Sequence, residues 1–216
     1  VKENGLLNGV MTVNSLQSGD RRIMPLTSDW LIAADTPILH LLELFAEDDT
    51  RNFFVLSSSK IMGMVSPADL NRIPARASVY LLVAHYETLL TELIRQEIGE
   101  TEETLRRYLS ERSIEKARNT RNQERDADLE LPLIRYLNLF DLVEIIKKHD
   151  NLWQCLDFEK RDAANILKFT TVRNAVAHLN NLLINTKDDI RKINADCGKM
   201  IEYSQKITQM LRDTNT

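Results

Sequence analysis

The sequence predicts a mostly α-helical protein, with a small α/β module ahead of a C-terminal helical bundle. Hydrophobic residues make up 43% of the 216 residues, which is enough to build a folded core. Only 6 Gly and 5 Pro occur in the chain, and this scarcity favours long uninterrupted helices. Strand-like patterns are confined to the first third, whereas the pattern from Ala77 onward is helical.

The first third predicts a strand, a helix and a hairpin in succession. Residues 30–49 predict a short strand, a turn that ends at Pro37, and then a helix with an apolar stripe. Residues 52–66 predict a hairpin whose strands are Phe53–Leu56 and Ile61–Val65, joined by a serine-rich turn. This order indicates a compact α/β module.

The remainder predicts a series of helices with recognisable ends. Gly99 is a glycine stop for the first long helix, and Thr101 and Thr186 are candidate N-caps with acidic residues after them. The predicted helical segments are residues 78–98, a short helix after 101, 110–130, 133–149, 157–183 and 186–213. We therefore expect two domains, residues 1–75 and 76–216.

Composition excludes several classes of protein. No run of about 18 apolar residues is present, so we expect no membrane span, and the first 15 residues contain no apolar segment typical of a secretion signal. Cys155 and Cys197 form no CxxC pair and are typical of reduced cytoplasmic thiols. The four histidines are scattered, so we expect no metal site and no required cofactor. The net charge of −4 gives no general attraction to nucleic acid, although it leaves room for a small RNA-cutting cleft.

The segment Thr170–Asn181 places polar side chains inside an apolar helix. Arg173, Asn174 and His178 lie among valines, alanines and a leucine. Asn174 and His178 are four residues apart and share one helix face, while a long arginine stem can bridge the angle from Arg173. The three polar groups can therefore converge on one concave spot.

The run from Arg173 to His178 resembles the signature of HEPN domains. In that family a late helix of a helical bundle carries an arginine, usually a polar residue next, and a histidine after a gap of four to six residues. The gap here is four, and the resemblance covers residues 76–213. Many HEPN proteins are metal-independent ribonucleases whose motifs face each other in a dimer. The resemblance therefore implies a homodimer with an RNA substrate.

The residue types suit this chemistry, because RNA supplies its own nucleophile in the neighbouring 2′-hydroxyl. The resemblance implies that His178 moves a proton, Arg173 stabilises charge on the phosphorane, and Asn174 holds the phosphate or orients the histidine. The alternative is a satisfied polar cluster that serves only helix or subunit packing.

A strongly charged segment precedes these residues. Between Ser110 and Arg125 it carries five basic and three acidic residues. Arg118, Arg121 and Arg125 recur at helical spacing and are candidates to guide an RNA backbone. A solvated helix face is the alternative interpretation.

Residues 61–73 resemble the end of a CBS motif, and with the preceding elements the resemblance covers residues 27–75. In that family a hydroxyl at the helix start often meets phosphate and the following aspartate meets ribose. Carried over, this implies nucleotide binding by Ser66 and Asp69, with an adenine nucleotide as a regulator. Both residues are also good helix-start residues. Only one copy of the motif is visible, so the module would pair between chains or serve dimerisation.

These observations favour a cytoplasmic homodimeric endoribonuclease of the toxin or phage-defence type. One alternative is a non-catalytic nucleotide-sensing or dimerisation scaffold. Another is a HEPN toxin paired with a nucleotidyltransferase-type antitoxin protein.

Overall fold

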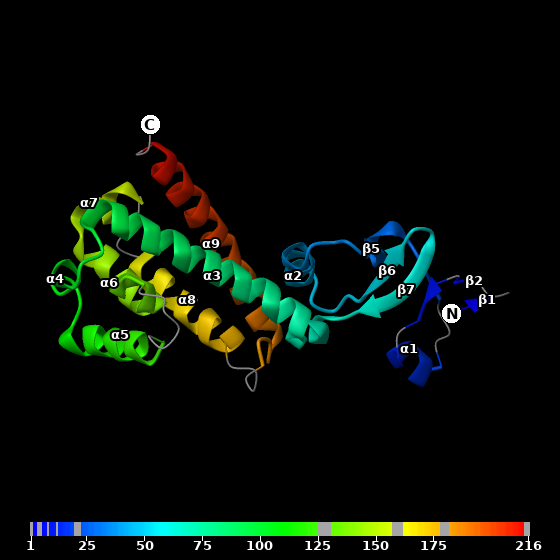
Figure 1. Cartoon of the computed structure of the whole chain (residues 1–216). Coiled ribbons are helices and arrows are strands. Elements are labelled where there is room, and N and C mark those ends of the chain that lie inside the picture. Colours follow the sequence, from blue (N-terminus) through cyan, green and yellow to red (C-terminus); the bar gives the residue numbers. More distant parts are fainter. Residues whose placement is uncertain are drawn as a thin grey trace. The chain divides into compact units, whose positions relative to one another are not determined.

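The protein is described by a computed structural model with two compact units, Val1–Leu70 and Asn71–Thr216 (Figure 1). The described residues are 2–3, 6–7, 9–11, 13–19, 23–124, 131–156, 162–177 and 182–213. The molecule is mostly helical, and its described strands all lie in the N-terminal unit. The division follows Leu70, ahead of the boundary expected after residue 75.

The N-terminal unit contains a three-stranded sheet of order β5-β6-β7. Its elements are β5 (Leu31–Ala33), α2 (Ile38–Glu47), β6 (Phe53–Ser57) and β7 (Lys60–Val65). Strands β5 and β6 are parallel and are joined through α2, while β6 and β7 form an antiparallel hairpin. Phe45 of α2 is fully buried and packs on Phe53, with ring centroids 5.3 Å apart. The strand, helix and hairpin order is the predicted one.

Smaller elements precede and follow this sheet. They are β1 (Lys2–Glu3), β2 (Leu6–Leu7), β3 (Gly9–Val10), α1 (Val13–Gln17), β4 (Met24–Pro25) and the 3₁₀ turns Ser28–Trp30 and Pro67–Asn71. Strand β1 pairs with β2 and β3 pairs with β4, each antiparallel.

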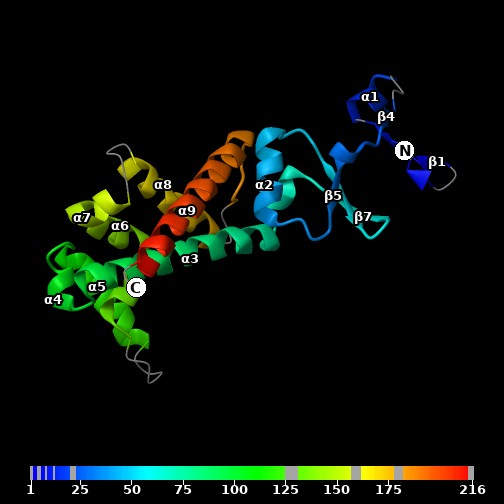
Figure 2. The same ribbon diagram turned by 90° about the horizontal axis from the view of Figure 1, so that it is seen from above.

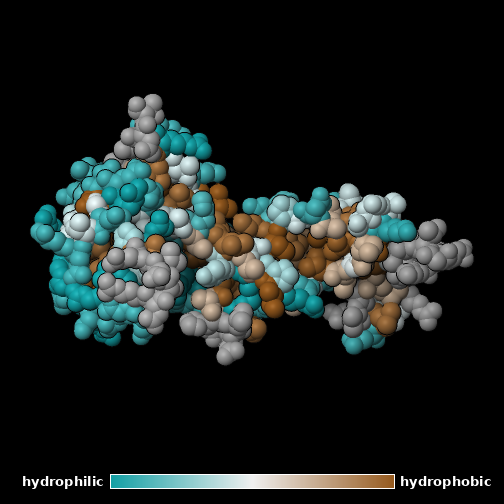
Figure 3. All heavy atoms as spheres, viewed as in Figure 1, coloured by the Kyte–Doolittle hydropathy of each residue, from teal (hydrophilic) through white to brown (hydrophobic). Residues whose placement is uncertain are grey.

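The C-terminal unit is organised around one long helix, α3. Its elements are α3 (Ile73–Ile98), α4 (Glu102–Leu105), α5 (Glu111–Glu124), a 3₁₀ turn (Leu133–Tyr136), α6 (Leu139–Lys148), α7 (Asp150–Cys155), α8 (Asp162–Ala177) and α9 (Lys187–Asp213). Helices α3, α8 and α9 pack against one another, and α6 packs on both α3 and α8 (Figures 1 and 2). Hydrophilic residues cover the viewed face over α4 and α5 (Figure 3).

Three aromatic rings mark the centre of this bundle. Phe169 of α8 meets Tyr86 of α3 edge-on at 5.7 Å and Tyr203 of α9 at 6.2 Å between ring centroids. Phe169 and Tyr86 are fully buried. Burial raises the pKa of the Tyr86 phenol well above its ordinary value, so this group stays neutral. One residue from each of three helices therefore fixes their packing.

The helix ends follow the predicted chemistry. Gly99 ends α3 with φ of +86°, a conformation that strains other residues. The Thr101 side chain accepts the N–H of Thr104 at the start of α4. At the start of α9, Thr186 and Asp189 each accept the other's backbone N–H. Helix α7 was not expected; His149 caps it, because its Nδ1 accepts the N–H of Leu152.

Candidate phosphate-binding site

Helix α8 presents a buried face and a polar face. Phe169, Val172 and Val176 are buried and recur at helical spacing. Asn174 is exposed and Arg173 is half-buried, so both lie outside the core. The polar residues that interrupt the apolar run therefore occupy a separate side of the helix.

The Arg173 cavity is a hollow of about 270 Å³ on this polar side. Its lining comes from α8 (Thr170, Arg173, Asn174), from the start of α6 (Asn138, Leu139, Phe140) and from α5 (Lys116). These residues bring a guanidinium, an ammonium, two amides and a hydroxyl to one place, and no carboxylate is among the described lining residues. Two cations with several hydrogen-bond donors suit an anion, and a phosphate accepts both charge and hydrogen bonds.

The cavity wall at α6 is held by the helix's own capping. The Asn138 side chain accepts the N–H of Asp141 at 3.2 Å, and the Asp141 carboxylate accepts the N–H of Asn138 at 3.4 Å. Asp141 is buried, so this capping box is protected from water. The first turn of α6 is therefore a fixed wall.

Glu87 of α3 lies beside Arg173 and joins two walls of the cavity. Its Oε1 is 3.7 Å from the Arg173 Nε, and the backbone N–H of Leu139 donates a hydrogen bond to the same carboxylate. Oε1 is buried and has no hydrogen-bond partner among the described residues. Burial raises the pKa of Glu87, while Arg173 and then the Leu139 N–H oppose that shift.

Two further side chains fix the chain on either side of residues 178–181. The Arg76 guanidinium is buried and its Nη2 donates to the Ala175 carbonyl at 2.6 Å, in the last turn of α8. The Asn71 amide both donates to and accepts from the backbone of Ile184, at 2.9 and 2.8 Å. The backbone is therefore held by side-chain hydrogen bonds at Ala175, before residues 178–181, and at Ile184, after them.

Two of the three predicted catalytic residues lie at the Arg173 cavity. Arg173 and Asn174 lie together at the cavity, with the Arg173 Nη1 3.5 Å from the Asn174 Oδ1. His178 lies outside the described residues. The sequence did not single out Lys116, Glu87, Arg76 or Asn71. The sequence signals that could have indicated Arg76 and Glu87 are their positions as charged residues within a long apolar helix.

Of the predicted RNA-guiding arginines, Arg118 and Arg121 are not among the residues that line the Arg173 cavity. Arg118 forms an ion pair with Glu102, which also accepts from the Arg106 Nη2 at 3.0 Å. Hydrogen bonds from Arg118 and then Arg106 lower the pKa of Glu102, so its negative charge persists beside them. Arg121 is half-buried on α5, and Arg125 lies outside the described residues. Lys116 of the same helix lines the cavity.

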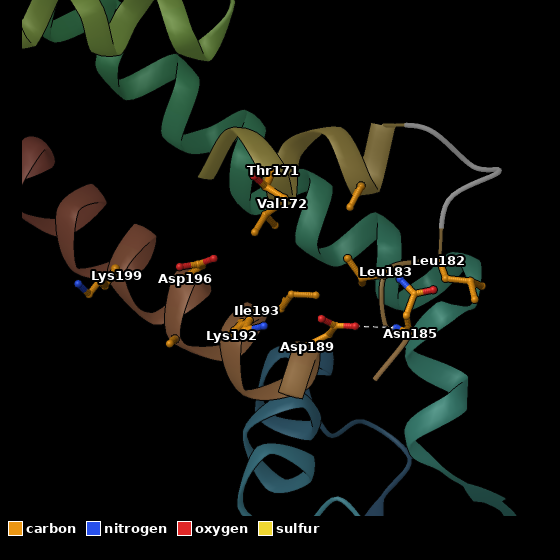
Figure 4. Close-up of a pocket in the computed structure, with 12 residues that line it drawn as sticks. Thr171, Val172, Leu182, Leu183, Asn185, Asp189, Lys192, Ile193, Asp196 and Lys199 are labelled. Atoms are coloured by element: carbon orange, nitrogen blue, oxygen red, sulfur yellow. Dashed lines mark hydrogen bonds between the residues drawn. The ribbon is translucent and has the colours of Figure 1, made fainter. Parts of the chain in front are cut away.

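A second, larger cavity of about 530 Å³ lies between α8 and α9, and we call it the α9 groove (Figure 4). Its floor is apolar and includes Val172, Ala175, Leu183 and Ile193. Along α9 it is lined by four residues of alternating charge: Asp189, Lys192, Asp196 and Lys199. Its apolar floor and mixed charges differ from the cationic Arg173 cavity.

In the N-terminal unit, Ser66 and Asp69 bind each other. The backbone N–H and the hydroxyl of Ser66 both donate to the Asp69 Oδ2 at 2.8 Å. This pair caps the 3₁₀ turn that starts at Pro67. Such capping is what is expected of residues at the start of a helix. Neither Ser66 nor Asp69 is among the residues that line two cavities found in this unit, of about 510 and 410 Å³.

Comparisons with known proteins supply no identification. No family model matches the chain, and no match was found among curated proteins or solved structures. Among the described residues, no cluster of His, Cys, Asp and Glu could hold a metal ion. Within the same described part of the chain, every helix is too short or too polar to cross a membrane.

Proposed function

We propose that this protein is a metal-independent endoribonuclease of the toxin or defence type, and that RNA phosphate binds in the Arg173 cavity. The observation that carries the proposal is the meeting of Arg173, Asn174 and Lys116 around one hollow. His178 follows Asn174 by four residues in the chain. A phosphodiester needs these donors and a proton carrier, and the resemblance supplies the carrier as His178.

The proposed reaction uses the RNA's own 2′-hydroxyl. Its oxygen attacks the adjacent phosphorus and its proton passes to a base, while the bond from phosphorus to the 5′-oxygen breaks and that oxygen takes up a proton. Arg173 and Lys116 would stabilise the charge on the phosphorane, and Asn174 would orient a phosphate oxygen. His178 would take part in the proton transfers. The products are a 2′,3′-cyclic phosphate and a 5′-hydroxyl.

The test is RNA cutting by the purified chain and by single variants. Arg173→Ala and His178→Ala should each lower the cutting rate at least about a hundredfold while the fold is retained. EDTA should leave the rate unchanged. Asn119→Ala, at an exposed position of α5, serves as the control. If the parent protein cuts no RNA, alone or after separation from an antitoxin protein, the non-catalytic scaffold becomes the better interpretation.

The α9 groove supports a homodimer of this chain. A second copy of α9 laid antiparallel across the first would place Asp189 opposite Lys199, and Lys192 opposite Asp196. This self-complementary charge pattern is the arrangement that a two-fold contact uses. Sedimentation should therefore give twice the 24.9 kDa mass of one chain.

Charge exchange tests this contact. Lys192→Glu and Asp196→Lys should each weaken the dimer, because each places like charges opposite each other in both symmetry-related contacts. The double variant should restore it. Arg191→Glu, on α9 but not among the residues that line the groove, is the control. If none of these substitutions changes the stability of the dimer, the dimer forms through another surface.

A further inference from the structure

We propose that Glu87 is a positioning residue that holds Arg173 and the start of α6 in the geometry that binds phosphate. This inference rests on the proposed function and extends it to a residue of α3. Glu87 is not among the lining residues of the Arg173 cavity, so its expected action is through Arg173 rather than on the substrate.

The geometry assigns separate tasks to the atoms of the Arg173 guanidinium. Glu87 Oε1 approaches the Nε edge at 3.7 Å, whereas Nη1 lies 3.5 Å from the Asn174 Oδ1 at the cavity. A guanidinium held at Nε keeps its two terminal nitrogens available for a phosphate, which favours a paired contact. Without Glu87 the charge would remain, but the planar group would be free to rotate.

The same carboxylate also fixes the opposite wall. The Leu139 N–H that donates to it belongs to the first turn of α6, and Leu139 lines the cavity. Glu87 thus sets the distance between Arg173 on α8 and Asn138 and Phe140 at the start of α6. Since hydrogen bonds to phosphate weaken steeply with misalignment, this spacing governs binding.

The burial of one Glu87 carboxylate oxygen argues for a role beyond packing. Oε1 is buried and has no hydrogen-bond partner among the described residues. A buried charged oxygen without such a partner destabilises a fold more than a neutral amide or an apolar side chain of similar size would. Groups retained against stability are concentrated at functional sites.

The experiment compares Glu87→Gln with Glu92→Gln. Glu92 is on the same helix and pairs with Arg95 through two hydrogen bonds, at 3.0 and 2.5 Å. The side chains of the two acidic residues are similarly exposed, at 27% for Glu87 and 29% for Glu92. Neither Glu92 nor Arg95 lines the Arg173 cavity. Both variants remove one negative charge from a carboxylate–guanidinium pair, so their difference reports on the cavity.

The probe is a fluorescent RNA oligonucleotide with 2′-O-methyl groups, which cannot be cut because the 2′-oxygen is no longer a nucleophile. Glu87→Gln should weaken its binding to the full chain about tenfold, and Glu92→Gln should leave it unchanged. Glu87→Asp, which keeps the charge, should recover part of the loss. Melting curves check the fold, because the amide oxygen of the introduced glutamine can still accept the Leu139 N–H.

The outcomes separate this inference from the proposed function. A parent protein that binds the probe but never cuts ordinary RNA would end the nuclease proposal, while the Glu87 comparison would still decide the positioning role. Equal binding by the parent and Glu87→Gln would overturn the positioning role alone. A parent that binds no probe would overturn both, because the cavity would then not be a phosphate site.

Discussion

Helix α8 separates two cavities of different chemistry. The Arg173 cavity gathers cations and amides from α5, α6 and α8, whereas the α9 groove has an apolar floor and balanced charges along its rim. Val172 lines the second and Arg173 the first, although they are neighbours in sequence. Adjacent residues of a helix lie about 100° apart, so one helix can pack a core and serve a site.

The largest expected difference between the buried face and the polar face of α8 is in the free energy of unfolding when a residue is replaced. Phe169→Ala should lower the free energy of unfolding by about 3–5 kcal/mol, because it removes a buried ring that contacts Tyr86 and Tyr203. Arg173→Ala should lower it by no more than about 1 kcal/mol, since the side chain is 37% exposed and water screens its ion pair with Glu87. Urea denaturation of both variants gives these values. A loss of stability in Arg173→Ala as large as that in Phe169→Ala would show that Arg173 is a packing residue, and the two faces of α8 would then not differ.

A smaller loss of stability is expected when the side chain that holds Ile184, just after residues 178–181, is removed. Asn71→Ala removes both hydrogen bonds to the Ile184 backbone and should lower the free energy of unfolding by about 1–3 kcal/mol. It should also lower RNA cutting, because Ile184 follows the segment that contains His178. Asn119→Ala should alter neither quantity. Unchanged cutting by Asn71→Ala would show that this anchor does not shape the site.

Local features of the fold could be predicted from sequence, because each depends on a few neighbouring residues. The hairpin after residue 52, the glycine stop at Gly99 and the cap at Thr101 follow from turn and capping chemistry. The start of α3 at Ile73 was missed, because the helical pattern was identified only from Ala77 onward. Proline suits a first helical turn, so Pro74 is compatible with this earlier start.

Contacts between distant residues could not be predicted in the same way. Arg173 was a candidate from its motif, but its partner Glu87 lies on another helix, and their approach depends on how α3 and α8 pack. The three arginines of the charged helix looked equivalent by spacing. Tertiary structure sets Arg118 apart, because Glu102 of α4 pairs with it. The cavity is lined instead by Lys116, which the spacing did not indicate.

The smallest expected effect is a pH-dependent gain in stability from Glu87→Gln. Burial raises the folded-state pKa of Glu87 above its ordinary value, so between those two values the native state binds protons more tightly than the unfolded state. Stability of the parent therefore falls as pH rises through that window, and the loss is complete above the folded-state pKa. Within the part of the chain that the structure describes, the groups that act on this carboxylate are Arg173 from α8 and the Leu139 N–H from α6.

Glutamine does not titrate, so Glu87→Gln should match the parent near pH 4 and unfold at a higher temperature at pH 7 to 8. Glu92→Gln should show the opposite sign, because its partner Arg95 lowers the pKa of Glu92 and the parent gains stability as pH rises. Melting temperatures of the three proteins across this pH range test the difference. A Glu87→Gln variant that is more stable at neutral pH yet binds RNA less well would show that Glu87 is retained for the Arg173 cavity. A variant less stable at every pH would mean that the Arg173 pair outweighs burial, and Glu87 would then be a packing residue like those on the buried face of α8.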